Sequence, residues 1–244
     1  MSQTTPSPTI LVTGSTRGIG AAIAETLAQA GATVIGHGAR PRSGSDAPIA
    51  ADLSDPQAPE RLWLEALDRS PTGRIDVLIN NAGLFAPNPI GASDIAWLDA
   101  WEDTLRINLT AAQLSRLAVQ HWQAAGTGGR IVHIASRAGH RGDSPEHWHY
   151  AAAKGGMLAL HKTIARGYAA QGILSFAIAP GFTDTGMAED YLASRGGAGL
   201  LADIPLGRVA APEEIAAIAR FCALDAPPSM TGAVIDANGA SYVR

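Results

Sequence analysis

Cysteine is almost absent from this chain of 244 residues, because Cys222 is the only one. One cysteine excludes an intramolecular disulfide and any metal site built from several cysteines. The chain also lacks a basic excess: Lys and Arg number 18 and Asp and Glu number 22, which gives a formal net charge of −4. Without surplus positive charge to neutralise phosphates, the composition disfavours nucleic acid as a partner.

Long apolar runs and targeting signals are missing as well. Apolar stretches such as Ile215–Leu224, which Arg220 interrupts, fall short of the roughly 20 residues that a membrane helix needs. Residues 1–8 are polar and proline-rich, so we expect a flexible leader there and no secretory signal. With 46% hydrophobic and 16% charged residues, the chain is typical of a compact, soluble protein, and we expect it in the cytoplasm, away from membranes.

Short β-rich runs alternate with alanine- and leucine-rich stretches of helical period. The expected strands are Ile10–Thr13, Thr33–Gly36, a run ending at Asp52, Ile75–Asn80, Ile131–Ala135, Ile173–Ala179 and Ala233–Asp236. The expected helices are a stretch from Ile19 that stops at Gly31, Pro56–Asp68, Trp97–Ala125, His149–Ala170 and Pro212–Leu224. Apolar strands that alternate with helices predict a parallel sheet covered on both faces. We therefore expect one doubly wound, Rossmann-type α/β domain over residues 9–244, with a loop at Arg40–Pro48.

A glycine-rich turn (TGSTRGIG) follows the first expected strand and opens the first helix. Its spacing is G-x-x-x-G-x-G, which differs from the general dinucleotide fingerprint. Glycine lets the backbone approach a phosphate closely, and the N–H groups of a helix start attract the anion. A turn that uses glycine for steric reasons alone is the alternative. We expect a cofactor to contact Gly14, Ser15, Thr16, Arg17, Gly18, Ile19 and Gly20.

Two other strand ends carry residues suited to a nucleotide. Asn81, Ala82 and Gly83 follow the fourth expected strand, where small and amide residues can line an adenosine pocket; an ordinary Asn/Gly turn is the alternative. Asp52 and Leu53 end the third expected strand. Asp52 is placed to accept a hydrogen bond from an adenine amino group or to cap the next helix, although Asp55 is the better cap candidate.

The end of the second expected strand separates the two nicotinamide cofactors. An acidic residue there binds the ribose 2′-hydroxyl of NAD, whereas arginine favours the 2′-phosphate of NADP. The chain has His37 and Arg40 in this segment and no carboxylate before Asp46, and Arg17 adds another cation. Arginine suits a phosphate because of its planar fork of donors. We therefore assign His37 and Arg40 to the cofactor and favour NADP over NAD; solvated loop charges are the alternative.

Tyr150 and Lys154 lie four residues apart, so both side chains share one helical face. A free tyrosine has a pKa of about 10, and a nearby ammonium lowers that pKa toward the range in which a general acid or base works. Ser136, at the end of the preceding strand, is placed to hold a substrate carbonyl against the Tyr150 hydroxyl. Asn108 interrupts a helical pattern, and its amide is suited to hold a water that leads protons to Lys154.

Taken in this order, the motifs TGSTRGIG, NNAG, Asn108, Ser136, Tyr150-x-x-x-Lys154 and Pro180-Gly181 resemble the short-chain dehydrogenase/reductase family. Within it, the chain is similar to the 3-oxoacyl-carrier-protein reductase-like branch, from about Thr9 to Val243. The resemblance implies that Tyr150 is the acid–base, that Lys154 binds ribose and lowers the tyrosine pKa, and that Ser136 orients the carbonyl. Asn108 would be the water-relay residue.

The resemblance also implies a metal-free hydride transfer between a nicotinamide and a ketone or secondary alcohol. Pro180, Gly181 and Phe182 would border the nicotinamide, with Thr183 and Thr185 contacting its carboxamide or the pyrophosphate. Asp184–Gly199 would form a lid over the substrate. Members of this family pair the long helices, here Trp97–Ala125 and His149–Ala170, into homo-oligomers, so by analogy we expect a tetramer or dimer.

Several features have other interpretations. The segment Gly139–His149 contains three histidines but no helical pair with glutamate, so a solvated loop is favoured over a metal site. His133 is interpreted as a packed strand residue, and Trp97 and Trp101 as packing on the core or on another subunit. A nucleotide-binding regulator with the same fold, an NAD-dependent dehydrogenase, and an enzyme that dehydrates or isomerises its substrate are the alternative functions. Cofactor consumption separates the first and the last of these from a reductase.

Overall fold

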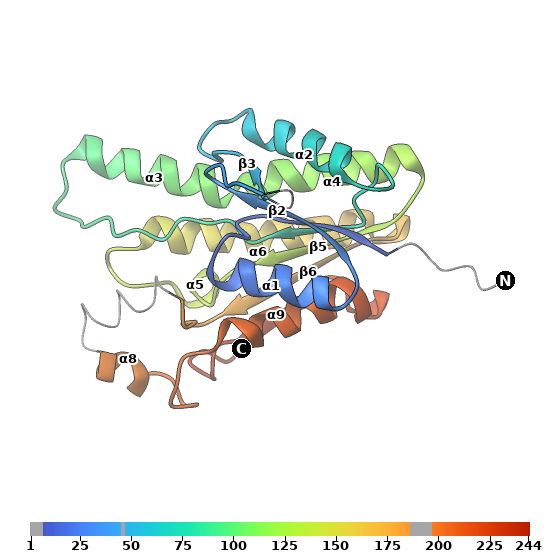
Figure 1. Cartoon of the computed structure of the whole chain (residues 1–244). Helices are drawn as coiled ribbons and strands as arrows, with labels where there is room; N and C mark the ends of the chain where they lie inside the picture. The colour runs from blue at the N-terminus through green and yellow to red at the C-terminus, as the bar shows by residue number, and fades with distance from the viewer. Residues whose placement is uncertain (1–6, 45–46, 186–196) are drawn as a thin grey trace.

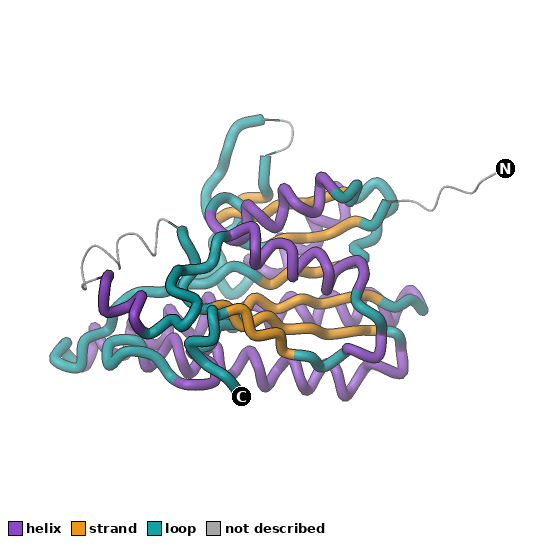
Figure 2. The backbone as a smooth tube through the Cα atoms, turned by 90° about the horizontal axis from the view of Figure 1, so that it is seen from below, coloured by secondary structure: helices purple, strands orange, loops and turns teal. Residues whose placement is uncertain are grey.

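The strands form one parallel sheet of seven, in the order β3-β2-β1-β4-β5-β6-β7. The computed structural model describes residues 7–44, 47–185 and 197–244. The strands are β1 Thr9–Val12, β2 Thr33–Gly38, β3 Ile49–Ala50, β4 Val77–Asn80, β5 Gly129–Ile134, β6 Ile173–Pro180 and β7 Val234–Ala237. They run side by side between layers of helices (Figure 2). The predicted doubly wound parallel sheet is confirmed.

Helices cover both faces of this sheet (Figure 1). They are α1 Gly18–Gln29, α2 Ala58–Arg69, α3 Asp94–Asn108, α4 Thr110–Ala125, α5 Ala138–Arg141, α6 Trp148–Tyr168, α8 Gly197–Ala202 and α9 Pro212–Arg220. Short turns of other helix types follow at Ala169–Gln171, Phe221–Asp225 and Pro228–Met230. On one face α1 and α9 pack together, and on the other α4 contacts both α2 and α6.

Each face has its own apolar core. Ile23 of α1 and Ile215 of α9 are buried against strand residues such as Val132. On the opposite face, Leu62 of α2 and Trp122 of α4 belong to a second buried cluster. Because both faces are covered, the strands are apolar almost throughout, and this is why they read as continuous hydrophobic runs in the sequence.

The prediction of one long helix over Trp97–Ala125 is wrong, because the chain forms two helices, α3 and α4, that meet at Leu109. Asn108 Nδ2 donates to Thr104 O over 2.9 Å, and Thr110 Oγ1 donates to Arg106 O over 2.7 Å. Side chains that bond to carbonyls four residues back compete with the helical ladder and bend a helix. The α-helix expected at Pro212–Leu224 also ends earlier, at Arg220, and continues as a wider π-turn. The other predicted elements are confirmed with ends moved by a few residues.

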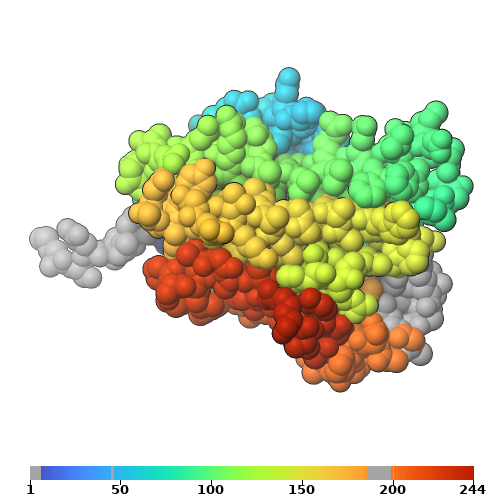
Figure 3. All heavy atoms as spheres, turned by 180° about the vertical axis from the view of Figure 1, so that it is seen from behind, coloured from blue at the N-terminus to red at the C-terminus, as the bar shows by residue number. Residues whose placement is uncertain are grey.

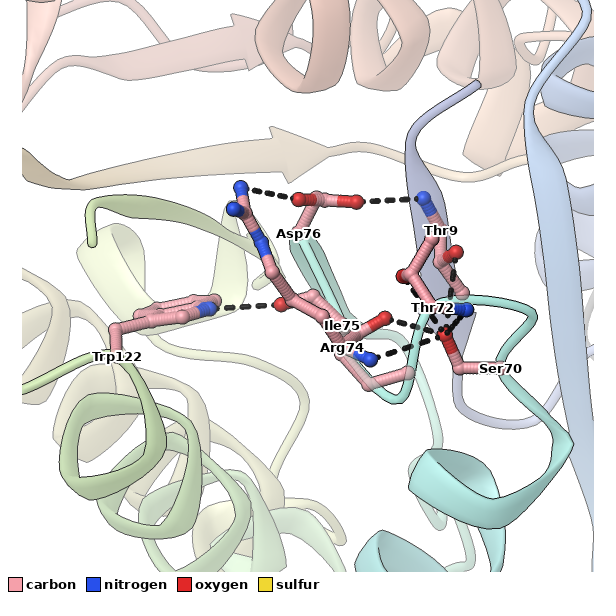
Figure 4. A network of polar contacts seen from close by, with 7 residues as sticks. All are labelled: Thr9, Ser70, Thr72, Arg74, Ile75, Asp76 and Trp122. Carbon is pink, nitrogen blue, oxygen red and sulfur yellow. Dashed lines mark hydrogen bonds and ion pairs between the residues drawn. The ribbon is translucent and has the colours of Figure 1, made fainter. Parts of the chain in front are cut away.

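Polar contacts hold the edge of the sheet at which its strands begin (Figure 4). Asp76 accepts a hydrogen bond from Thr9 N over 2.8 Å and forms an ion pair with Arg74. Trp122 Nε1 donates to Ile75 O over 2.7 Å, and Ser70 Oγ donates to Arg74 O over the same distance. These contacts connect α4 and the start of β4 to β1. They therefore fix the end of the sheet at which the strands begin, and the loops of the site follow the opposite, carboxyl ends of the strands.

The described part of Arg40–Pro48 contains no helix, as expected for a loop. Of the predicted leader, residues 1–6 lie outside the described residues, and so does 186–196 of the predicted lid. None of the described helices has the length and the apolar character needed to cross a membrane.

Candidate active site

A cavity of about 470 Å³ opens where β1, β2, β4, β5 and β6 end. Functional sites of doubly wound sheets lie at the carboxyl ends of the strands. The predicted site residues that line it are Gly14, Thr16, Arg17, Gly18, Ile19, Gly20, His37, Asp52, Leu53, Asn81, Ala82, Gly83, Asn108, Ser136, Tyr150, Lys154, Pro180, Gly181, Phe182, Thr183 and Thr185. Ser15 and Arg40 are the two predicted residues that do not line it.

The glycine-rich turn brings bare backbone to one end of this cavity. Gly14 and Gly18 have φ values of 64° and 53°, a region that favours glycine. A Cβ on Gly14 would lie 2.9 Å from Ala82 Cα, so the turn has no room for a side chain there. Helix α1 starts at Gly18 without an acidic residue in its first turn. Its unpaired N–H groups therefore form an anion site that no carboxylate of that turn fills.

The NNAG segment is bound to this turn. Asn81 Nδ2 donates to Thr13 O over 2.9 Å and to Gly14 O over 3.1 Å. Thr13 Oγ1 accepts from Asn81 N and Ala82 N over 2.9 and 3.0 Å. The side chain of Asn81 thus holds the glycine-rich turn in place, which is a structural role beside the predicted one of lining the nucleotide pocket.

The side chain of His37, on β2, is also hydrogen-bonded to the glycine-rich turn. Its Nδ1 accepts a hydrogen bond from Gly14 N over 3.1 Å, so Nε2 carries the proton and donates to Ala51 O over 2.9 Å. Burial lowers the pKa of His37, which keeps the ring neutral and able to accept. Both ring nitrogens are therefore occupied by backbone groups.

Ser15 and Arg40 stay outside the cavity for identifiable reasons. Ser15 Oγ accepts from His37 N over 3.0 Å, which turns the hydroxyl toward β2. Arg40 is exposed in the loop, and its neighbour Arg42 is the arginine of this loop that reaches the turn, with its guanidinium 3.4 Å from Thr16 O. The predicted contact of Arg40 with a cofactor stays a prediction without a structural counterpart.

Asp52 lies at the rim of the cavity. Its Oδ1 accepts from Ser54 N over 3.0 Å and from Ser54 Oγ over 2.8 Å, and these bonds lower the pKa of the carboxyl. Asp55 makes the corresponding bond to Gln57 N over 2.9 Å. Helix α2 begins at Ala58, so neither carboxylate stands at the capping position itself. Asp52 forms a local turn and remains ionised beside the cavity.

Tyr150, the expected acid–base group, lies at the end of the cavity opposite the glycine-rich turn. The Tyr150 hydroxyl is hydrogen-bonded to Ser136, and Ser136 Oγ accepts from Ala138 N over 3.1 Å. Burial raises the pKa of Tyr150 to about 12; the nearby Asp143 raises it further, and the Ser136 bond opposes the rise. Burial dominates the Tyr150 pKa in the free protein, and the Lys154 ammonium lies 5.7 Å from the ring centroid. The predicted lowering of the tyrosine pKa by Lys154 stays a prediction.

Lys154 and Asn108 face the same space from different helices. Lys154 Nζ donates to Ile134 O over 2.8 Å, and burial lowers the pKa of this lysine to about 8. Asn108 Nδ2 donates to Leu84 O over 3.0 Å, while its buried Oδ1 accepts no hydrogen bond from the described residues. A Cβ on Gly83 would lie 2.7 Å from that Oδ1 and 3.6 Å from Lys154 Nζ. Glycine therefore keeps this space open.

The cavity is also lined by residues that the sequence reasoning did not assign to the site, among them Phe85, Arg137 and Asp143. The rings of Phe85 and Tyr150 form a T-shaped pair with a centroid distance of 4.8 Å. Arg137 is next to Ser136 in the chain, and this adjacency was the one available signal. Phe85 and Asp143 stand in loops whose paths depend on contacts far along the chain.

The histidine-rich segment before Tyr150 is only in part the solvated loop that was expected, because residues 141–143 are exposed but two of its histidines are not. His147 is buried and stacks on Phe85 at 4.1 Å between centroids, and His149 is buried near Trp101. The contact with Phe85, in the loop that follows β4, withdraws the His147 ring from water. Among the described residues, no three His, Cys, Asp or Glu side chains gather to hold a metal ion.

One packing interpretation is confirmed: His133 is buried in the sheet, with its Nδ1 3.4 Å from Asn80 Nδ2. Trp97 and Trp101 are half-buried and contact each other at 5.4 Å between ring centroids, so their packing on the core or on another subunit stays a prediction.

Comparison with curated proteins reveals relatives along nearly the whole chain. The chain is 36% identical over 243 residues to the 3-oxoacyl-(acyl-carrier-protein) reductase FabG of Escherichia coli, covering 96% of each. It is 35% identical over 243 residues to a 3-oxoacyl-(acyl-carrier-protein) reductase of Synechocystis, covering 94% of each.

Solved structures agree with this relationship. A protein of Beutenbergia cavernae assigned as an NAD(P)-dependent gluconate 5-dehydrogenase, with bound NADP, superposes with a TM-score of 0.85 at 33% identity. One of Agrobacterium tumefaciens assigned as a 2-deoxy-D-gluconate 3-dehydrogenase, also with bound NADP, gives 0.81 at 31% identity. Both comparisons cover 96% of each chain. The family model described as enoyl-(acyl carrier protein) reductase matches residues 14–239. The chain therefore belongs to the short-chain dehydrogenase/reductase family.

Proposed function

We propose that this protein is an NADP(H)-dependent oxidoreductase that transfers a hydride between the nicotinamide and a ketone or secondary alcohol. The observation that carries the proposal is the convergence of Ser136, Tyr150, Lys154 and Asn108 on one cavity whose other end is the glycine-rich turn. The related structures assigned as gluconate dehydrogenases hold NADP, which supports the same cofactor for this chain.

The residues present fit this cofactor. The turn Gly14–Gly20 offers a backbone cradle that a Cβ would fill, at the N-terminus of α1. Among the described residues that line the cavity, no carboxylate comes from the end of β2, and Arg17 supplies a cation next to the turn. An acidic side chain there would select the free ribose hydroxyl, so its replacement by Gly38 and Ala39 favours the 2′-phosphate of NADP. Asn81, Asp52 and Leu53 are left to line the adenosine part.

NADPH supplies the hydride when it is bound. The protein then has to hold the carbonyl and deliver a proton to its oxygen. Ser136 Oγ donates a hydrogen bond to that oxygen, and the Tyr150 hydroxyl gives it a proton as negative charge develops. The two hydroxyls are already hydrogen-bonded to each other, so a carbonyl oxygen that enters between them meets two oriented donors.

The protonation states of the free protein suit reduction. With a pKa of about 12, Tyr150 is a protonated phenol at neutral pH and can act as an acid. Lys154, with a pKa of about 8, is mostly an ammonium at neutral pH. Its charge stabilises the phenolate that remains after proton transfer. Asn108 Oδ1 then accepts from a water that returns a proton by way of Lys154.

Three further expectations belong to this proposal. Residues 9–244 form one catalytic domain. The protein works in the cytoplasm. It assembles into a homo-oligomer through α3, α4 and α6, which lie next to one another on one face of the molecule (Figure 3). Leu98 of α3 and Trp148 of α6 are 56% and 52% exposed there, and large apolar side chains at that exposure favour a partner surface.

The test is cofactor consumption by the purified protein. NADPH and NADH oxidation are followed with a panel of ketones that includes an acetoacetyl thioester, with Tyr150→Phe as the control. NADPH oxidation that depends on Tyr150 supports the proposal. Tight binding of the cofactor without its consumption in either direction contradicts it and favours a nucleotide-binding regulator. Conversion of a hydroxy substrate without net cofactor turnover favours a dehydratase or isomerase.

A further inference from the structure

The ring of Phe85 lies between the histidine-rich segment and Tyr150. It stacks on the ring of His147, with the centroids 4.1 Å apart and the planes inclined by 7°. With Tyr150 it forms a T-shaped pair, at a centroid distance of 4.8 Å and an angle of 78°. Aromatic rings in such arrangements stabilise each other beyond the area that they bury. Three rings from two separate segments of the chain therefore form one continuous contact that ends at the expected acid–base group.

His147 is a fixed base for this contact. It directly precedes α6 and is only 2% exposed. Its N–H donates to Ser144 O over 2.9 Å, and its carbonyl accepts from Ala151 N over 3.0 Å. Its ring Nδ1 is hydrogen-bonded to Ser144 Oγ over 2.7 Å. Because the main chain and the ring are both bonded, the imidazole presents one orientation to Phe85.

The loop that carries Phe85 is bound to the same segment. Residues 81–93 contain no helix or strand, so contacts with other parts of the chain determine the path of this loop. Asn88 N donates to Glu146 O over 2.8 Å, and Asn88 Nδ2 donates to Trp97 O over 3.0 Å. Glu146 is next to His147 in the chain. The loop and the start of α6 are thus joined twice, by this backbone bond and by the ring stack.

Tyr150 needs a restraint that persists during the reaction. In the free protein its hydroxyl is hydrogen-bonded to Ser136. In the proposed reaction a carbonyl oxygen enters between the two hydroxyls and replaces that bond, so the bond cannot hold the phenol while the proton is transferred. The contact with Phe85 is made by the ring and takes no part in this exchange. A catalytic group has to stay within about 0.5 Å of its productive position, and the packing of supporting side chains keeps it there.

We infer that Phe85 and His147 are positioning residues for Tyr150: His147 fixes the Phe85 ring, and this ring holds the phenol in line with the substrate carbonyl. This inference rests on the proposed function. Among the described residues, Phe85 lines the cavity and His147 does not, so His147 acts on the reaction through its neighbours. Phe85 contacts both other rings and is the neighbour that connects them. The histidine-rich segment thereby gains a role in ordering the phenol.

A double-mutant cycle tests this path. The kcat for NADPH-dependent reduction is measured at saturating ketone for Phe85→Leu, for His147→Leu and for the protein with both changes. Leucine keeps an apolar side chain but removes the flat ring. Each single change is expected to lower kcat on the order of tenfold, with the NADPH affinity of His147→Leu nearly unchanged. Because His147 acts through Phe85, the double variant should be no slower than Phe85→Leu, whereas independent effects would multiply to about 100-fold.

Two further variants separate positioning from a general loss of structure. His147→Phe keeps a flat ring for stacking and is expected to restore most of kcat. His161→Leu is the matched control, because His161 is buried on the same helix, is bonded to Ser175 Oγ over 2.8 Å and lies outside the cavity lining. It should lower stability in urea unfolding, as His147→Leu does, but leave kcat unchanged. Losses that multiply in the cycle, no rescue by His147→Phe, or an equal loss of kcat in His161→Leu overturns the inference.

A spectroscopic readout separates this inference from the proposed function. The four tyrosines of the chain are labelled with 13C at Cζ, and the Tyr150 resonance is identified by its loss in Tyr150→Phe. His147→Leu should shift this resonance, and His147→Phe should return it toward the wild-type position. Absence of turnover with every ketone in the wild type contradicts the reductase alone. A Tyr150 resonance that His147→Leu leaves in place contradicts the positioning role whether or not turnover is found.

Discussion

The side-chain oxygen of Asn108 faces Gly83, and a Cβ added to this glycine would lie 2.7 Å from Asn108 Oδ1. The same Cβ would lie 3.6 Å from Lys154 Nζ. The space beside Gly83 is thus bounded by an acceptor on α3 and a donor on α6, and it stays open because residue 83 has no side chain.

Gly83→Ala is predicted to displace Asn108 or Lys154. Because small misplacements of catalytic groups are costly, kcat should fall roughly tenfold or more while the fold is kept. Gly167→Ala is the matched control, since nothing described lies within 4 Å of a Cβ at that helical position. The control should leave kcat unchanged and stabilise the protein by up to about 1 kcal/mol. Equal kcat values for the two variants would show that the space beside Gly83 has no part in the reaction.

Cofactor choice is predicted to depend on Arg17. Arg17 lines the cavity beside the glycine-rich turn, so Arg17→Ala should weaken NADPH binding on the order of tenfold more than NADH binding. Arg40 lies outside the cavity lining, and Arg40→Ala should change that ratio less. Arg116→Ala, an exposed change on α4, controls for net charge. Titrations that show the same loss for both cofactors in Arg17→Ala would remove this residue from 2′-phosphate recognition.

The lysine pKa predicts how cofactor binding depends on pH. Burial lowers the pKa of Lys154 to about 8, so the ammonium is present below that pH and is lost above it. NADPH affinity of the free protein should therefore fall as pH rises through about 8. Lys154→Arg keeps its charge to higher pH and should remove this fall. The chain's other lysine, Lys162, is exposed, and the Lys162→Arg variant should still lose NADPH affinity as the pH rises through about 8. If the affinity of Lys154→Arg falls over the same pH range, the titrating group is not Lys154.

Local sequence patterns predicted the sheet and the four expected catalytic residues, because strand ends and helical spacing are properties of short segments. Arg137 was missed because its direction depends on the bond from its amide to Pro180, 43 positions away in the chain. The burial of His147 likewise depends on a ring contact with Phe85 across the site. The break at Leu109 arises from side-chain bonds of Asn108 and Thr110 that periodicity does not register.

Acid is predicted to destabilise the fold through His133. Burial, and then the positive fields of His161 and Lys154, lower the pKa of His133 from 6.5 to about 3. The unfolded chain therefore binds the proton more tightly, and stability falls as pH drops through 6.5 toward 3. One such group costs about 1.4 kcal/mol per pH unit, so about 2 kcal/mol is lost between pH 6.5 and 5.

Urea unfolding at pH 7 and pH 5 checks this loss. His133→Asn should be less stable at pH 7 but should lose less stability between the two pH values than the wild type. Ile131→Val, a buried change on the same strand, should lower stability by about 1 kcal/mol at both pH values and keep the wild-type difference. A wild-type difference that His133→Asn fully retains would assign the acid lability to other groups.

The most direct test of the account follows the hydride itself. NADPH carrying deuterium at the transferable C4 position is incubated with the protein and a ketone that it reduces, and the alcohol is analysed by mass spectrometry. We predict one deuterium on the carbinol carbon for each NADPH consumed. Tyr150→Phe should form this product slower by about 100-fold or more, with cofactor affinity nearly unchanged. Alcohol without deuterium, or equal rates for the two proteins, would contradict hydride transfer with Tyr150 as the acid.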